Sequence, residues 1–132
     1  MEKKPLMENK KCFCDTGLLF DACCGLYLHN NQKAPTALDL MRSRYSAYAT
    51  QNADYLLETT HVSERPYYSK AEILKWATVN KWQKLEIISF TENTVAFKAY
   101  FLDSNGKPQT HYEFSTFKKE HNAWYYVDGK FE

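Results

Sequence analysis

The 132-residue chain holds all four of its cysteines in one short stretch, with the spacing C-x-C-x8-C-C. Disulfides are disfavoured, because the adjacent Cys23 and Cys24 can pair with each other only in a strained ring and no secretory signal precedes them. A redox dithiol would more usually be C-x-x-C beside a βαβ pattern. Zinc readily takes four thiolates, so we expect a structural Zn2+ site on Cys12, Cys14, Cys23 and Cys24, with four buried free thiols as the alternative.

The residues between the cysteines supply a turn. Gly17 can take a positive φ, and Asp15 and Thr16 can cap backbone amides. His29 follows the cluster and is a spare ligand at most, because four thiols complete a tetrahedral shell without it. A bound ion would fold a segment that is too short to have a core of its own.

Composition predicts a folded, single-domain protein. Apolar residues make up 44% and aromatic residues 16% of the chain, which is too rich for disorder. The formal charge of +1 argues against a nucleic-acid partner bound through bulk electrostatics. No apolar run approaches the roughly 20 residues of a membrane helix, and no targeting segment is evident, so we expect a cytoplasmic protein without a membrane partner.

Three helices are expected after the cysteine cluster. The first begins after Thr36, a plausible N-cap, and carries Arg42 and Arg44 at the two borders of its apolar face. That face comprises Ala37, Leu38, Met41, Tyr45, Tyr48 and Ala49. A short second helix, 53–60, follows Asn52, and a capping box opens a third helix at Ser69.

The second half of the chain alternates with the period of β-strands. Four strands are expected, at 82–91, 95–103, 109–119 and 123–128, and Asn105-Gly106 is a strong hairpin signal. Helices followed by an antiparallel meander indicate an α+β fold, with a sheet that curls around the first helix. The predicted organisation is a flexible tail (1–11), a zinc knuckle (12–28) and an α+β domain (34–132).

Residues Cys12 to Gly25 resemble the SEC-C motif, a short zinc-binding element found at the tail of the SecA translocation motor and fused to many bacterial proteins. The sequence departs from the usual pattern at Phe13 and Asp15, where Pro and Gly are common. Leu18, Leu19 and Asp21 replace residues that are commonly basic. Metal binding should survive these changes. Leu18, Leu19 and Phe20 are expected to pack the knuckle onto the rest of the chain.

The whole chain resembles the YchJ family of small bacterial proteins. The resemblance is carried by the SEC-C-like stretch, by Leu-Met-Arg-Ser-Arg-Tyr-Ser-Ala-Tyr at 40–48 and by Trp-Tyr-Tyr-Val-Asp-Gly at 124–129. The family implies a nuclear-transport-factor-2-like (NTF2-like), or cystatin-like, cone: helices followed by a curved four-stranded antiparallel sheet. It does not imply an activity.

Folds of this kind often carry a pocket between the curved sheet and the helices. The candidate lining residues are Arg42, Arg44, Tyr45, Tyr48, His61, Trp76, His111, Glu113, Tyr126 and Asp128. His111, Glu113 and Ser115 share one face of a strand, and the favoured interpretation is a solvent-facing stripe. An ion pair of Arg42 or Arg44 with Glu113 or Asp128 is the first contact to test.

The leading functional hypothesis is a zinc-containing binding or adaptor protein, with the knuckle as metal site and partner surface and the cone as a pocket or homodimer face. The alternative is a small-molecule enzyme of isomerase or dehydratase type, with Glu113 or Asp128 as general base and Arg42 or His61 orienting the substrate. A third hypothesis, by analogy with SecA, is a module that binds translocation or ribosome machinery; the missing basic residues count against it.

Overall fold

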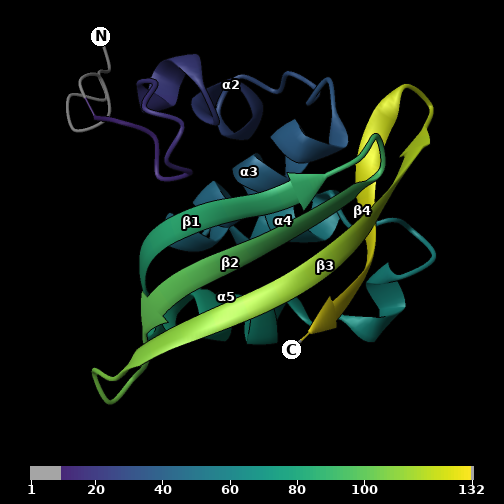
Figure 1. The fold of residues 1–132 in the computed structure, drawn as a ribbon. Coiled ribbons are helices and arrows are strands. Elements are labelled where there is room, and N and C mark those ends of the chain that lie inside the picture. Colours follow the sequence, from purple (N-terminus) through teal and green to yellow (C-terminus); the bar gives the residue numbers. More distant parts are fainter. Residues whose placement is uncertain (1–9, 132) are drawn as a thin grey trace, which may run out of the picture.

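The computed structural model describes residues 10–131, so most of the predicted tail lies outside the described residues. The three longest helices precede one antiparallel sheet (Figure 1): α3 (Ala37–Ala49), α4 (Ala53–Glu58), α5 (Lys70–Val79), β1 (Lys81–Phe90), β2 (Thr94–Leu102), β3 (Pro108–Glu120) and β4 (Ala123–Phe131). A 3-10 turn, η2 (Arg65–Tyr67), lies between α4 and α5. The strands pair in the order β1-β2-β3-β4, each with its neighbour in sequence. The α+β architecture predicted from the sequence is confirmed.

Each of these helices begins at a side-chain cap. Oxygens of Thr36, Asn52 and Ser69 accept the backbone N–H three residues further on, at 3.0, 3.1 and 3.3 Å. The second helix ends at Glu58, two residues earlier than expected. Its end is displaced because Thr60 leaves the helix to form an isolated parallel bridge with β4.

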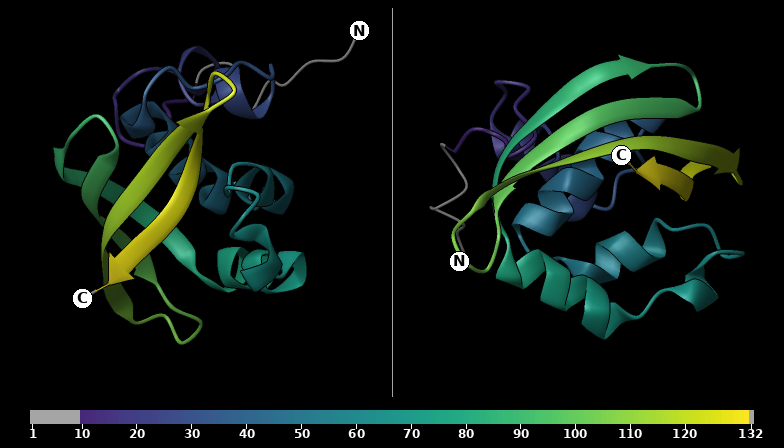
Figure 2. Two further views of the ribbon diagram at one scale, coloured as in Figure 1. Left: turned by 90° about the vertical axis from the view of Figure 1, so that its right-hand side faces the viewer. Right: turned by 60° about the horizontal axis from the view of Figure 1, so that its bottom comes forward.

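The sheet is bent around the helices. Register shifts interrupt the β1–β2 pairing twice and the β3–β4 pairing once, and such bulges increase local twist and curvature. In Figure 2 the helices lie along the concave side, with α3 closest to the sheet and α4 and α5 below it. The core therefore sits between α3 and the inner face of the strands.

The knuckle is a compact segment with two short helices that were not predicted, η1 (Phe20–Ala22) and α2 (Gly25–Leu28). Lys11 forms an isolated bridge with Leu19, which holds this part of the loop extended. Phe20, the first residue of η1, is fully buried, whereas Leu19 just before it is 43% exposed. The expectation that Leu18 and Leu19 pack inward is wrong, because Leu18 is 54% exposed; only Phe20 does so.

Three contacts join the knuckle to the body of the protein. Asp15 Oδ2 accepts a hydrogen bond of 2.8 Å from the backbone N–H of Leu85 on β1. Arg42 Nη1 donates to the carbonyl oxygen of Cys14 at 2.8 Å, and Cys12 Sγ lies 3.6 Å from a serine hydroxyl of α3. Buried side chains of the knuckle belong to the same apolar cluster as those of α3 and the sheet.

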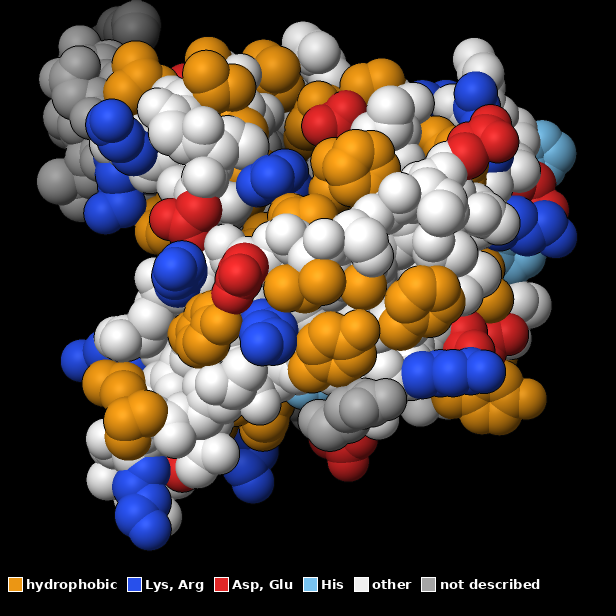
Figure 3. Space-filling view, viewed as in Figure 1, with side chains coloured by type: hydrophobic (Ala, Val, Ile, Leu, Met, Phe, Trp, Pro, Cys, Tyr) orange, Lys and Arg blue, Asp and Glu red, His pale blue; other side chains and the backbone are white. Residues whose placement is uncertain are grey.

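The outer face of the sheet carries a mixed surface. Figure 3 shows hydrophobic side chains over the strands, interspersed with Lys, Arg, Asp and Glu. Phe114, which lies between the inward-facing Glu113 and Ser115, is 40% exposed. Within the part of the chain that the structure describes, no helix combines the length and apolarity required to cross a membrane.

Candidate functional site

The four cysteines meet in one cluster, as the sequence predicts. All four are free, and their sulfur atoms lie within 4.8 Å of one another. Cys12, Cys14 and Cys24 are buried and Cys23 is half-buried. Zinc–sulfur bonds of about 2.3 Å in a tetrahedron place sulfurs about 3.8 Å apart. The Sγ atoms of Cys14 and Cys23 are separated by 3.7 Å, so the donor set fits a metal ion.

The close thiols change one another's pKa values. Hydrogen bonds with Cys14 and Cys24 lower the pKa of Cys12 well below the usual thiol range. The same contact with Cys12 raises the pKa of Cys14 to about 11 and, together with Cys14, raises the pKa of Cys24 further. Deprotonation of Cys12 is therefore favoured at the expense of Cys14 and Cys24. A cation at the centre is what makes four thiolates compatible.

Residues around the cluster define its outer side. The Thr16 hydroxyl accepts the backbone N–H of Leu18 at 3.3 Å and lies 3.3 Å from Cys23 Sγ, as expected of a capping residue in this turn. Gly17 has a φ of 88°, the positive value that the sequence predicts. His29 is exposed and its ring lies edge-on to Phe20, with centroids 5.3 Å apart. Among the described residues, the group close enough to hold an ion consists of the four cysteines.

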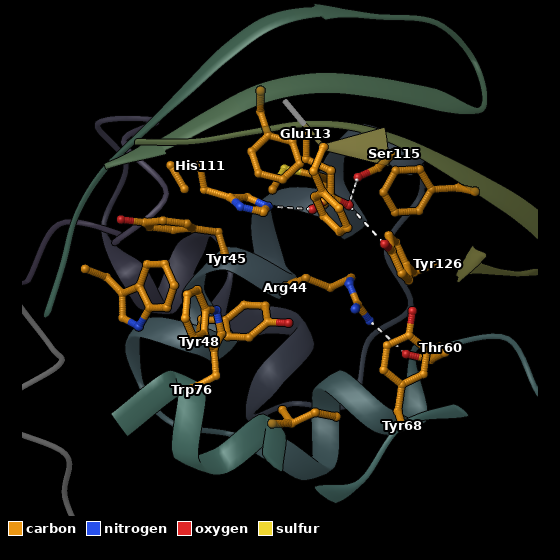
Figure 4. Close-up of a pocket in the computed structure, with 17 residues that line it drawn as sticks. Arg44, Tyr45, Tyr48, Thr60, Tyr68, Trp76, His111, Glu113, Ser115 and Tyr126 are labelled. Atoms are coloured by element: carbon orange, nitrogen blue, oxygen red, sulfur yellow. Dashed lines mark hydrogen bonds and ion pairs between the residues drawn. The ribbon is translucent and has the colours of Figure 1, made fainter. Parts of the chain in front are cut away.

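A cavity of about 330 Å³ lies between the concave face of the sheet and the helices (Figure 4). Its lining draws on α3, α5, the loop before α5 and all four strands. Seven predicted residues line it: Arg44, Tyr45, Tyr48, Trp76, His111, Glu113 and Tyr126. Thr60, Tyr68, Trp82, Phe97, Ser115, Phe117, Phe131, Met41, Ile73 and Ala99 complete the lining.

Three predicted lining residues lie elsewhere. Arg42 points from α3 to the knuckle, where it binds the backbone of Cys14. His61 is buried, and its Nε2 lies 2.9 Å from a carboxylate oxygen of Glu120, the last residue of β3. Asp128 is exposed on β4. Helical and strand periodicity did not separate these three from the true lining, because each lies one position or one face away from it.

The stripe on β3 faces inward, which corrects the favoured interpretation of a solvent-facing row. Glu113 is 8% and Ser115 1% exposed, and His111 is half-buried beside them. Strand alternation showed that these side chains share a face, but it could not tell which face the helices cover. The polar groups tolerate this position because they satisfy one another.

Glu113 is the centre of that polar network. Its carboxylate accepts hydrogen bonds from His111 Nε2 at 2.9 Å, Ser115 Oγ at 2.7 Å and the Tyr126 hydroxyl at 3.0 Å. Burial opposes ionisation, but the three donors outweigh it and lower the pKa of Glu113 below its usual value. Burial and the charge of Glu113 raise the pKa of Tyr126. The pocket therefore contains an ionised carboxylate and neutral phenols.

Arg44 supplies the positive charge of the pocket. Its Nη1 donates to the carbonyl oxygen of Leu56 at 2.9 Å and to Thr59 Oγ1 at 2.7 Å, and its guanidinium carbon lies 4.4 Å from the centroid of the Tyr126 ring. The ion pairs within residues 10–131 do not include the predicted pairing with Glu113 or Asp128. Arg44 is held by neutral oxygens and an aromatic face.

Part of the lining was missed in the sequence. The inward alternation of β2 and β3 marks Phe97, Ala99 and Phe117 as neighbours of Glu113, so strand period alone could have found them. Tyr68 lies in the loop before α5, where no periodic signal exists. Phe131 lies beyond the register shift of the β3–β4 pairing, which breaks the alternation set by Tyr126. The presence of these two residues in the lining depends on tertiary structure, which local sequence patterns do not report.

The arrangement defines a class of protein: a cysteine knuckle that can hold a metal, built onto an NTF2-like cone with an aromatic pocket. Comparison with known families agrees, since the model for the YchJ middle NTF2-like domain matches residues 36–129. The chain belongs to the YchJ family.

Relatives cover most of the chain. A UPF0225 protein of Geobacter sulfurreducens is 37% identical over 125 residues, spanning 89% of this chain and 77% of that protein. A UPF0225 protein of Enterobacter sp. (strain 638) is 38% identical over 124 residues, spanning 89% and 81%.

Two solved structures share the fold. The solution structure of a SEC-C motif containing protein from Rhodopseudomonas palustris matches with a TM-score of 0.83 and 34% identity, over 90% of this chain and 96% of that one. The crystal structure of a SEC-C motif containing protein from Psychrobacter arcticus matches with a TM-score of 0.80 and 32% identity, over 93% and 83%.

Proposed function

We propose that this protein binds a small molecule in the cone, and that its knuckle holds a structural zinc ion. The observation that carries the proposal is the cavity of about 330 Å³ with aromatic walls and a few convergent polar groups. Ligand pockets of about 300–1,000 Å³ are typically apolar, with a small number of placed polar side chains. Arg44 and Glu113 are such groups, on two different elements of the fold.

Zinc is proposed on the chemistry of the donors. An all-cysteine set of four is a preferred ligand set for zinc and leaves no open coordination position for a reaction. Three of the four sulfurs are buried against α3, so an ion there would tie the knuckle to the body rather than face a substrate. Four unpaired thiols also suit a reducing compartment such as the cytoplasm.

An enzyme that uses Glu113 as general base has less support. A catalytic base works best with a pKa near the operating pH, whereas three donors hold the pKa of Glu113 below its usual value. Asp128 and His61, the other candidates for catalysis, lie outside the pocket lining. Binding without a reaction is therefore the simpler proposal.

A protein partner for the knuckle is the second candidate function. Leu18 and Leu19 are 54% and 43% exposed on the loop that carries the cysteines. Two adjacent apolar side chains on a rigid loop suit a small contact surface. A pull-down at low salt with the protein and with the variant Leu18→Ser/Leu19→Ser tests this role. Equal recovery of every partner by both proteins contradicts it.

The binding proposal is tested by screening a fragment library against the 15N-labelled, zinc-loaded full chain by NMR. Specific ligands should shift the amide signals of residues that flank the lining on α3 and β3 and leave the β2–β3 turn at Asn105-Gly106 unchanged. A lining variant, Ala99→Trp, should fill the cavity and abolish those shifts. Shifts that survive the Ala99 substitution, or a screen without any hit at the lining, refute the proposed pocket function.

A further inference from the structure

Two nitrogens of the Arg44 guanidinium, Nε and Nη2, indicate the chemical class of the ligand. Only Nη1 of this side chain has acceptors among residues 10–131, and these are Leu56 O and the hydroxyls of Thr59 and Thr60. Nε and Nη2 have no acceptor within that part of the chain, although Arg44 is 9% exposed and lines the cavity. Nε and Nη2 form the edge of a guanidinium that binds a carboxylate through two parallel hydrogen bonds.

The charge of this guanidinium is not balanced by a protein carboxylate. Glu113, the carboxylate in the lining, is engaged by three donors and forms no ion pair with Arg44 among the described residues. The Tyr126 ring face attracts the guanidinium but carries no net charge. Among residues 10–131 no fully buried side-chain donor lacks a partner, so the two unused nitrogens of Arg44 keep access to solvent in the cavity. An anionic ligand group there satisfies both the charge and the hydrogen bonds of this largely buried cation.

The walls of the cavity favour a planar, apolar body. Trp76 and Trp82 line the cavity edge-on to each other, with ring centroids 6.2 Å apart, and the Tyr45 and Tyr48 rings pack against Trp82. Phe101 supports both tryptophans from outside the lining. Flat rings at the walls contact a flat ring with more area than an aliphatic chain offers. The volume of about 330 Å³ restricts the ligand to a small one.

Glu113 sets the orientation of that ligand. Its side chain projects from β3 into the cavity, on the side opposite Arg44 of α3 (Figure 4). Being ionised, it repels a second anion and accepts hydrogen bonds. A ligand that places its acid group at Arg44 and a hydroxyl or amine donor at its opposite end therefore satisfies both Arg44 and Glu113.

Resting on the proposed binding function, we propose that the pocket takes a small aromatic carboxylate. Its acid group accepts two hydrogen bonds from Nε and Nη2 of Arg44, and its ring lies between the aromatic walls. A donor on the ring points to Glu113. The Tyr48 hydroxyl, which lines the cavity and has no partner among the described residues, is available as a further donor to the acid group.

A matched pair of probes tests the acid group without changing the protein. Titration calorimetry with the zinc-loaded full chain compares 4-hydroxyphenylacetate with 4-hydroxyphenylacetamide, which has the same size and shape but is neutral and carries an NH2 donor in place of one acceptor oxygen. The carboxylate should bind at least about 10-fold more tightly, because the amide lacks the negative charge and offers only one of the two acceptor oxygens. Equal affinity, or tighter binding of the amide, overturns the inference while a pocket for neutral ligands stands.

Variants locate the acid group. Arg44→Lys keeps the charge but loses the two-donor edge, so we expect at least about 10-fold weaker binding of the carboxylate and a small change for the amide. The control, Lys75→Gln, removes an exposed cation from α5 and should leave both affinities unchanged. If the Arg44 variant does not fold, the comparison of the two probes on the unmodified chain still tests the inference. If neither probe binds, the inference fails, and the fragment screen decides separately whether the pocket binds other molecules.

Discussion

Gly129 on β4 lies against the carboxylate of Glu113 on β3: a Cβ at position 129 would overlap Glu113 Oε2. Gly129 is the pairing partner of Ser115, so the missing side chain is what lets the carboxylate reach its three donors. The glycine is required by this close approach and not by an unusual backbone angle. The geometry of the pocket's polar network therefore depends on a residue outside the pocket lining.

Gly129→Ala should displace the Glu113 carboxylate and break its hydrogen bonds. We expect the free energy of unfolding, measured in urea, to fall by about 1–3 kcal/mol, the cost of leaving buried polar groups without partners. The control is the same substitution in a Glu113→Ala background, which removes the overlap with the carboxylate and leaves only the close approach to the Tyr126 hydroxyl at the end of its side chain. An equal loss of stability in both backgrounds would show that the overlap with Glu113 is not the cause.

The helices and strands were predictable because their signals are local. The caps at Thr36, Asn52 and Ser69 form as the sequence indicates, and alternation located the four strands to within a few residues. The cysteine cluster was predictable for the same reason, since its ligands crowd into one turn. A cap acts over about three residues and strand alternation over about four to eight, so neither signal depends on the rest of the fold.

The orientation of the β3 stripe was not predictable. His111, Glu113 and Ser115 are polar, and polar residues on an antiparallel strand most often face water. They face inward here because Tyr126 from β4 and the open space beside Gly129 complete the network. These contacts join residues more than ten positions apart, which no periodicity reports. The hydrogen bond from the Leu85 backbone N–H to Asp15 was not predictable either, because it also joins residues far apart in the sequence.

Asp15 offers a test of how the knuckle is attached. Its φ of 66° is left-handed, and its carboxylate accepts the N–H of Leu85. Asp15→Asn keeps an acceptor and tolerates this backbone, whereas Asp15→Gly tolerates the backbone but loses the bond. We expect the Gly variant to be less stable by about 1–2 kcal/mol and the Asn variant to be close to the original. Hydrogen exchange at the Leu85 amide should accelerate only in the Gly variant; unchanged protection there would refute the role of this contact.

The depressed pKa of Glu113 predicts a pH dependence of stability. An unfolded Glu titrates near about 4.3, and the folded value is lower, so the unfolded state binds more protons between the two. The stabilisation is complete above the unfolded value and is lost as the pH falls through the folded one. Glu113→Gln should therefore be less stable than the original chain near pH 7 and approach it under acid conditions. Urea unfolding across that pH range measures the difference, and Glu92→Gln, an exposed substitution, should show a difference that does not vary with pH.

Removal of the proposed zinc ion should loosen the knuckle and spare the sheet. Purified protein should contain about one zinc per chain, and a ligand bound only by the folded state stabilises it by about 3 kcal/mol at 100 times its dissociation constant. Chelation, or Cys24→Ser, should lower the free energy of unfolding accordingly and collapse the NMR dispersion of residues 10–30, while the signals of β3 and β4 persist. Asp21→Asn, beside the cluster but outside the donor set, should retain zinc and stability. If the purified chain carries no stoichiometric metal, or if the chelator does not change its stability, the four cysteines cluster through packing alone and hold no ion.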